Sequence, residues 1–158
     1  MEELTAALQE LEAPFRTLVD DSQWAHASVE GLVLDLGGWW SADTHTRLQP
    51  QVTFSDAFSE AARHDGGVYV EGYLWVDGQA VAAAWCGLGN AVVYGPRAEA
   101  YLGVALSPHF CRRIQQRNGT AAVLMSKHPR LLPLLRDGLP RGAVVPGGRP
   151  GPRSVLRD

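Results

Sequence analysis

The side chains best suited to nucleophilic or metal chemistry are two cysteines and five histidines in a chain of 158 residues. Cys86 and Cys111 could each supply a thiolate, which attacks carbonyls or binds metals once its pKa is lowered. The histidines are His26, His45, His64, His109 and His128. No two of them are spaced to share a helical face, and the cysteines lie far apart, so the pattern favours no metal site. The glycines form neither a phosphate-binding loop nor a dinucleotide fingerprint, so we expect no cofactor.

Three other side chains are candidates for moving protons, namely Tyr94, Asp56 and Glu71. A tyrosine or a buried carboxyl group works as a general acid or base when its surroundings bring its pKa near the working pH. Asp56 also follows Thr53 by three residues, which is the spacing of a helix capping box. The simpler interpretation of Thr53 is therefore a helix cap.

Five short motifs occur in one order between residues 53 and 104: "TFSDAF", "YVEGY", "AAWC", "VVY" and "YLGV". In this order they resemble the small bacterial and phage thiol hydrolases of the papain-like and transglutaminase-like class. The resemblance implies an α+β fold, with a mostly antiparallel sheet packed against helices. It also implies that the family's catalytic cysteine, histidine and aspartate fall on Thr53, Ala83 and Tyr94. All three would have been replaced.

The resemblance implies a cleft that has lost its thiol and its imidazole. Its lining would be Thr53, Gly72, Ala83, Trp85 and Tyr94. The hydroxyl of Thr53 would need a base to attack a carbonyl, and Ala83 cannot be one. Such a cleft is either filled as core or open to an apolar ligand.

Two functions follow from this hypothesis. The first is a catalytically degenerate module that binds a peptide, a protein or a small apolar ligand, or assists another protein. The second is an enzyme with a repurposed cleft, such as a cyclase, isomerase or tailoring enzyme of a biosynthetic pathway. A third possibility, a working thiol centre at Cys86 or Cys111, predicts inactivation by iodoacetamide.

The central element must be a β-hairpin over residues 68–88, because Asp77-Gly78 is the dipeptide that a two-residue hairpin turn prefers. The turn pairs Gly72 with Ala83 and Val70 with Trp85, so these residues share the cleft face. The opposite face carries Glu71, away from that cleft, with three aromatic residues over a floor of alanines. The aromatic residues are Tyr69, Tyr73 and Trp75. Either this face binds a partner or a second copy of the chain, or a helix of the same chain covers it.

The flanking elements follow from periodicity and capping. A helix over residues 1–20 carries apolar residues at 4, 8, 11, 15 and 18, and Pro14 should kink or split it. Residues 22–52 predict one strand, ending at Gly37-Gly38. Helices should begin at Thr53 and at Ser107-Pro108, the second ending at Asn118-Gly119. Strands are expected over 90–95 and 120–126, before a short helix.

Composition sets the remaining expectations. Residues 1–137 predict one domain, and the Gly, Pro and Arg content of residues 138–158 predicts a flexible tail. The 14 basic and 17 acidic residues give a net charge of −3, which offers no general attraction for nucleic acid. No apolar run is long enough to cross a bilayer, and no secretion signal or disulfide framework is evident, so we expect a cytoplasmic protein without a membrane partner.

Overall fold

The computed structural model of this chain describes residues 1–19, 23–126 and 128–154. Its helices are α1 (Glu2–Leu18), α2 (Val29–Leu36), α3 (Phe54–Arg63), α4 (Pro108–Asn118) and α5 (Leu132–Asp137), with a 3-10 turn at Pro129–Leu131 before α5. The strands are β1 (Gly38–Trp40), β2 (Arg47–Gln49), β3 (Val68–Val76), β4 (Gln79–Leu88), β5 (Ala91–Pro96), β6 (Ala100–Leu106) and β7 (Arg149–Pro150).

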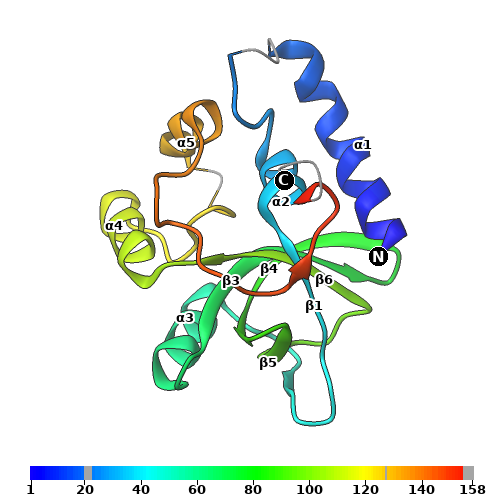
Figure 1. The fold of residues 1–158 in the computed structure, drawn as a ribbon, viewed down its shortest axis with the longest axis vertical. Helices are drawn as coiled ribbons and strands as arrows, with labels where there is room; N and C mark the ends of the chain where they lie inside the picture. Colours follow the sequence, from blue (N-terminus) through cyan, green and yellow to red (C-terminus); the bar gives the residue numbers. More distant parts are fainter. Residues whose placement is uncertain (20–22, 127, 155–158) are drawn as a thin grey trace.

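These strands form one sheet in the order β2-β5-β4-β3-β6-β1-β7. All neighbouring pairs are antiparallel except β2 and β5, so the predicted α+β class with a mostly antiparallel sheet is confirmed. The sheet curls until Ser41, just after β1, forms an isolated bridge with Ala91 at the start of β5, without closing into a barrel. In Figure 1 it crosses the middle of the molecule, with α1, α2, α4 and α5 above it and α3 at lower left.

The β3–β4 hairpin has the predicted turn and register. Asp77 and Gly78 both adopt positive φ, at 49° and 73°, as the two central residues of such a turn require. Gly72 pairs with Ala83, and Tyr73 with Ala82. The side chains that share each face of this hairpin are therefore those that the sequence predicted.

The two faces of the sheet bury two separate apolar clusters. The larger cluster lies under the helices and includes Leu4, Tyr69, Ala84 and Leu102. The smaller one fills the concave side of the curl, around Trp40, Val70, Ala83, Trp85 and Tyr101. Because Ala83 and Ala84 are neighbours in β4, they point to opposite clusters.

Two predicted helices are confirmed with their caps. The Thr53 hydroxyl accepts a hydrogen bond from the Asp56 amide at 2.9 Å, and the Asp56 carboxylate accepts one from the Thr53 amide at 3.3 Å, which is a complete capping box. The Ser107 hydroxyl caps α4, which ends at Gly119 in the left-handed conformation with φ 67°.

The predicted strand before Gly37-Gly38 is wrong. Residues 29–36 form α2, whose N-cap Ser28 accepts a hydrogen bond from the Gly31 amide at 3.1 Å. Four successive residues, 31–34, are buried because α2 packs between α1 and the sheet, so the run resembles a buried strand rather than a one-sided helix. Of the two outcomes predicted for Pro14, a kink or a split, the split does not occur, since α1 continues through Pro14.

Residues 120–126 form an irregular segment rather than the predicted strand. Residues 138–154 also differ from the predicted flexible tail, because the Ser107 amide donates to the carbonyl of Ala143 at 2.8 Å and β7 pairs with β1. Arg153 then joins Glu12 of α1 and Asp35 of α2, at 2.6 and 3.1 Å. Residues 155–158 of the predicted tail, and residue 20 of the predicted N-terminal helix, lie outside the described residues. No helix in the described part of the chain is long and apolar enough to span a bilayer.

Candidate functional site

The predicted cleft is not assembled around Thr53 and Ala83. Phe58 of α3 packs edge-on against Tyr69, with ring centroids 5.3 Å apart, which places α3 on the Tyr69 face of the hairpin. Ala83 points to the other face, into the concave cluster. Alternation along a strand determines which residues share a face, but it does not determine which face a helix covers.

The Gly72, Ala83 and Trp85 side of the hairpin is a filled core. Trp85 is fully buried, and its ring meets Tyr101 edge-on at 5.4 Å. A Cβ on Gly103 would lie 2.7 Å from the Trp85 ring, so a glycine is needed there to make room for the indole. The prediction of a cleft on this face is therefore wrong, and the alternative of a filled core holds.

Tyr94 and Asp56 occupy structural positions. Tyr94 pairs with Cys86 across β4 and β5, and the guanidinium of Arg47 lies 5.2 Å from its ring centroid. Tyr94 therefore points away from Ala83. Asp56 is exposed and completes the capping box with Thr53.

The aromatic face of the hairpin is largely covered by the chain's own helices. Tyr69 is 2 % exposed and Tyr73 is 8 % exposed, so the predicted interface is wrong for these two residues. Trp75 is half-buried, near the turn of the hairpin. The covering helix was the alternative that the sequence left open.

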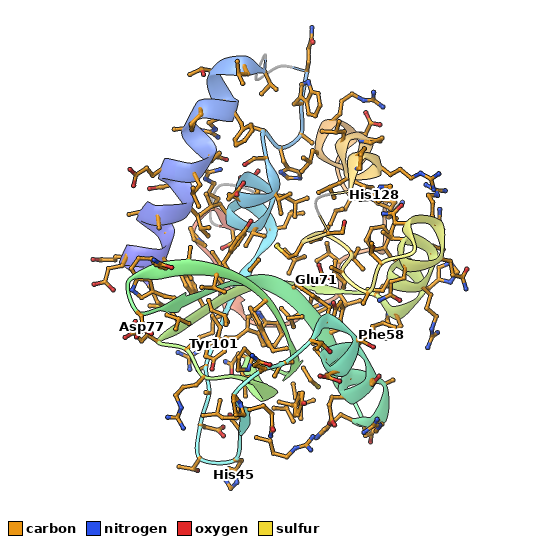
Figure 2. All side chains as sticks on the ribbon, turned by 180° about the vertical axis from the view of Figure 1, so that it is seen from behind. His45, Phe58, Glu71, Asp77, Tyr101 and His128 are labelled. Carbon is orange, nitrogen blue, oxygen red and sulfur yellow. The ribbon has the colours of Figure 1, made fainter. Side chains whose placement is uncertain are left out.

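Glu71 is fully buried on this face and accepts four hydrogen bonds (Figure 2). One oxygen accepts from the Tyr69 hydroxyl at 2.6 Å and from the Val123 amide at 2.7 Å. The other accepts from the amides of Leu124 and Met125, at 2.7 and 3.0 Å. The amides of residues 123–125 turn inward to bind the carboxylate, which explains why this segment is not a strand.

Burial dominates the ionisation of this region. It raises the pKa of Glu71, although the hydrogen bonds from Tyr69 and the three amides act in the opposite direction. Burial, followed by the charge of Glu71, also raises the pKa of Tyr69. All four groups around Glu71 belong to the chain itself, so no hydrogen-bonding position is left for a substrate.

Neither cysteine lies in surroundings that would activate it. Both are completely buried. Burial, followed by the charge of Glu60, raises the pKa of Cys86 to about 11. Burial, followed by the charge of Glu71, raises the pKa of Cys111 to about 12. A catalytic thiol requires the opposite shift.

The candidate site is an open groove of about 710 Å³ at the other end of the aromatic face, between α1, α2, α5 and the sheet. Its floor includes Tyr73, Ala80 and Ala82, and the rest of its lining is mostly apolar. The lining residues are Leu11, Phe15, Leu18, Val19, Trp24, Ala27, Ser28, Val29, Glu30, Tyr73, Ala80, Ala82, Leu124, Met125, Leu132 and Leu135.

The groove exposes half of an apolar stripe that the sequence predicted. Leu4 and Leu8 of α1 are fully buried, whereas Leu11 and Phe15 are each 47 % exposed and Leu18 is 79 % exposed. The stripe thus leaves the core halfway along the helix and becomes one wall of the groove. Sequence reasoning found the stripe but not the groove, since α2 and α5 were needed to form the other walls.

Glu30 and Tyr73 are the main polar groups of the groove. The Glu30 carboxylate lies close enough to the Tyr73 hydroxyl for its charge to act on the ionisation of the tyrosine. Burial, followed by the charge of Glu30, raises the pKa of Tyr73, so its hydroxyl stays protonated at neutral pH. The Ser28 hydroxyl is already used to cap α2.

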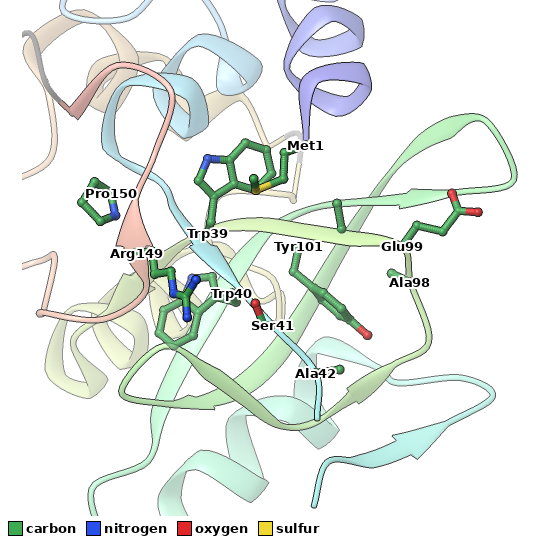
Figure 3. Close-up of a pocket in the computed structure, with 11 residues that line it drawn as sticks. Met1, Trp39, Trp40, Ser41, Ala42, Ala98, Glu99, Tyr101, Arg149 and Pro150 are labelled. Carbon is green, nitrogen blue, oxygen red and sulfur yellow. The ribbon is translucent and has the colours of Figure 1, made fainter. Parts of the chain in front are cut away.

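A second hollow, of about 470 Å³, lies beside β1 and β6 (Figure 3). Trp39, Trp40 and Tyr101 contribute aromatic surface, with Arg149 and Glu99 on its border. Its lining mixes polar and apolar groups, and it shares no residue with the groove. The groove is the larger and more apolar of the two.

The described residues contain no group of three or more His, Cys, Asp or Glu side chains arranged to hold a metal ion. Comparison of the chain with protein-family models, curated proteins and solved structures gave no match. The resemblance to thiol hydrolases therefore stays a prediction, and the groove is the feature of the molecule that points to a function.

Proposed function

We propose that this protein is a non-catalytic binding module whose groove holds a small, largely apolar ligand. The observation that carries the proposal is the hollow of about 710 Å³ with a nearly continuous apolar lining. Small-molecule sites are typically hollows of about 300–1,000 Å³ in which a few polar groups orient the ligand. The groove has this size, this lining and one glutamate–tyrosine pair.

Exposed apolar side chains give independent support. Eight large apolar residues in the described part of the chain are substantially exposed, and Leu11, Phe15, Leu18 and Leu132 among them line the groove. Contiguous apolar surface of this kind costs solubility unless something covers it, so it is typical of binding sites. A ligand that fills the groove removes this surface from water.

The proposal does not depend on the resemblance to thiol hydrolases, because Ala83 lies on the face of the sheet opposite to α3, which Thr53 caps. It agrees with the state of the two cysteines, since burial raises the pKa of both thiols. The alternative of an enzyme with a repurposed cleft has less support. None of its proposed proton-moving residues, Tyr94, Asp56 and Glu71, lines the groove.

The test uses two neighbouring residues of β4 that point to opposite faces. Ala82 is on the floor of the groove, and Val81 is 42 % exposed on the other side. The neutral fluorescent probe N-phenyl-1-naphthylamine should bind the wild type with enhanced emission. Ala82→Phe should weaken binding at least about tenfold by filling the groove, as expected for about 1.4 kcal/mol. Val81→Phe should leave binding unchanged.

Two further measurements distinguish a small ligand from the other possible occupants of the groove, a second copy of the chain or a peptide. If the groove is covered by a second copy of the chain, size-exclusion chromatography shows a dimer that Ala82→Phe dissociates, and the probe competes with dimerisation. If it holds a peptide segment, native mass spectrometry of the purified protein finds a peptide instead of a small molecule. Equal probe binding by both variants would refute the groove as the binding site.

A further inference from the structure

We infer that the ligand of this groove carries an ammonium group, or another cationic hydrogen-bond donor, at one end of its apolar body. This inference rests on the proposed function and names the chemical class of the ligand. It concerns the head group of the ligand, which would meet the charge of Glu30; the apolar lining accounts only for the apolar body of the ligand.

The charge of the lining is one-sided. Among the described residues that form the groove, Glu30 is the only acidic side chain, and none is lysine, arginine or histidine. Glu30 takes part in no ion pair among the described side chains, unlike Glu12, Asp35 and Glu60. A half-buried carboxylate facing an apolar hollow is costly unless a donor or a cation meets it.

The carboxylate also has hydrogen-bonding positions left over. A carboxylate accepts about four hydrogen bonds. Glu71 fills its four positions with Tyr69 and the amides of residues 123–125. Within the described part of the chain, Tyr73 is the polar side chain beside Glu30 in the groove. The remaining positions are available to a ligand that brings its own N–H donors.

The position of Glu30 in its helix is one where acidic side chains are favourable. Glu30 is in the first turn of α2, where the helix dipole stabilises an acidic side chain. The Ser28 hydroxyl accepts a hydrogen bond from the Gly31 amide, so α2 is already capped without Glu30. An anionic head group entering this end of the groove would meet the charge of Glu30, whereas an ammonium group would pair with it.

The test compares three probes that share an eight-carbon chain and differ in their head group: octylamine, octanol and octanoate at pH 7. Binding is followed by the chemical shifts of the Trp24 indole and of the Leu124 and Met125 amides, all of which belong to groove residues. An ammonium group hydrogen-bonds a carboxylate more strongly than a hydroxyl group does, because that hydrogen bond is charge-assisted. Octylamine should therefore bind about tenfold or more tightly than octanol, and octanoate should bind most weakly.

Two variants assign the preference to Glu30. Glu30→Gln keeps the shape of the side chain and should bring the affinities for octylamine and octanol within about twofold of each other. Glu99→Gln removes the same charge at an exposed site outside the groove and should leave the preference intact. This control separates an effect of the groove from an effect of net charge.

Each outcome decides one of the two proposals. If the three probes bind equally well, or octanoate binds best, the head-group inference is overturned while the binding function stands. If octylamine is preferred but Glu30→Gln retains the preference, the inference is overturned as well. If no octyl probe shifts the groove signals at millimolar concentration and Ala82→Phe has no effect on N-phenyl-1-naphthylamine, the proposed function fails.

Discussion

Tyr69 and Tyr73, on one face of strand β3, each lie beside a glutamate, and the two places differ in what surrounds the carboxylate. At one end, Glu71 is sealed by Tyr69 and three backbone amides. At the other, Tyr73 meets Glu30 at the floor of an open groove. The same two side-chain types hold the fold together in one place and face an open hollow in the other. The difference lies in how many donors the chain itself supplies.

The largest effect is expected at the sealed pair. In Glu71→Gln, an amide NH2 would face at least one backbone N–H that cannot become an acceptor, so two donors would oppose each other inside the core. We expect a loss of about 3–5 kcal/mol in the free energy of unfolding, measured by urea denaturation. Glu30→Gln is the matched control and should change stability by less than about 0.5 kcal/mol. Equal losses of unfolding free energy in Glu71→Gln and Glu30→Gln would show that the two carboxylates do not differ in their structural role.

The tyrosines should show a smaller difference in the same direction. Tyr69→Phe removes one of four donors from a fully buried carboxylate and should cost about 1.5–3 kcal/mol. Tyr73→Phe removes a hydroxyl that faces the open groove beside Glu30 and should cost less than about 1 kcal/mol. Thermal denaturation of the two variants under identical conditions measures the difference. A larger loss for Tyr73→Phe would show that the groove pair is also structural.

A further effect is expected at alkaline pH, through Cys111 beside the sealed pair. Its folded-state pKa is raised from 9.0 to about 12, because burial and Glu71 oppose a thiolate. The stability that this group contributes is therefore complete below pH 9 and is lost as the pH rises toward 12. In urea denaturation from pH 7 to pH 11, Cys111→Ala should lose less stability over this range than the wild type. Parallel curves would contradict the shift.

Much of this arrangement could be predicted from short stretches of sequence. Asp77-Gly78 determines the hairpin register, Thr53 with Asp56 determines the start of α3, and Ser107-Pro108 determines the start of α4. Each depends on residues a few positions apart, so local rules suffice. These rules also placed Tyr69, Glu71 and Tyr73 on one face.

The functional predictions failed where distant segments decide the outcome. Residues 120–126 have strand-forming composition, but their amides bind a carboxylate more than fifty positions earlier. Ala83 was assigned to a cleft because α3 was expected on its side of the sheet, whereas Phe58 packs on the other side. The groove requires α1, α2 and α5 together, and no local pattern brings them into contact.

The contacts of Arg153 also bear on the order of events during biosynthesis. Its guanidinium holds Glu12 and Asp35, which precede it by 141 and 118 positions. On the ribosome, both acidic side chains are made long before the arginine that neutralises them. Helices α1 and α2 therefore reach their final electrostatic environment only after residue 153 has left the exit tunnel.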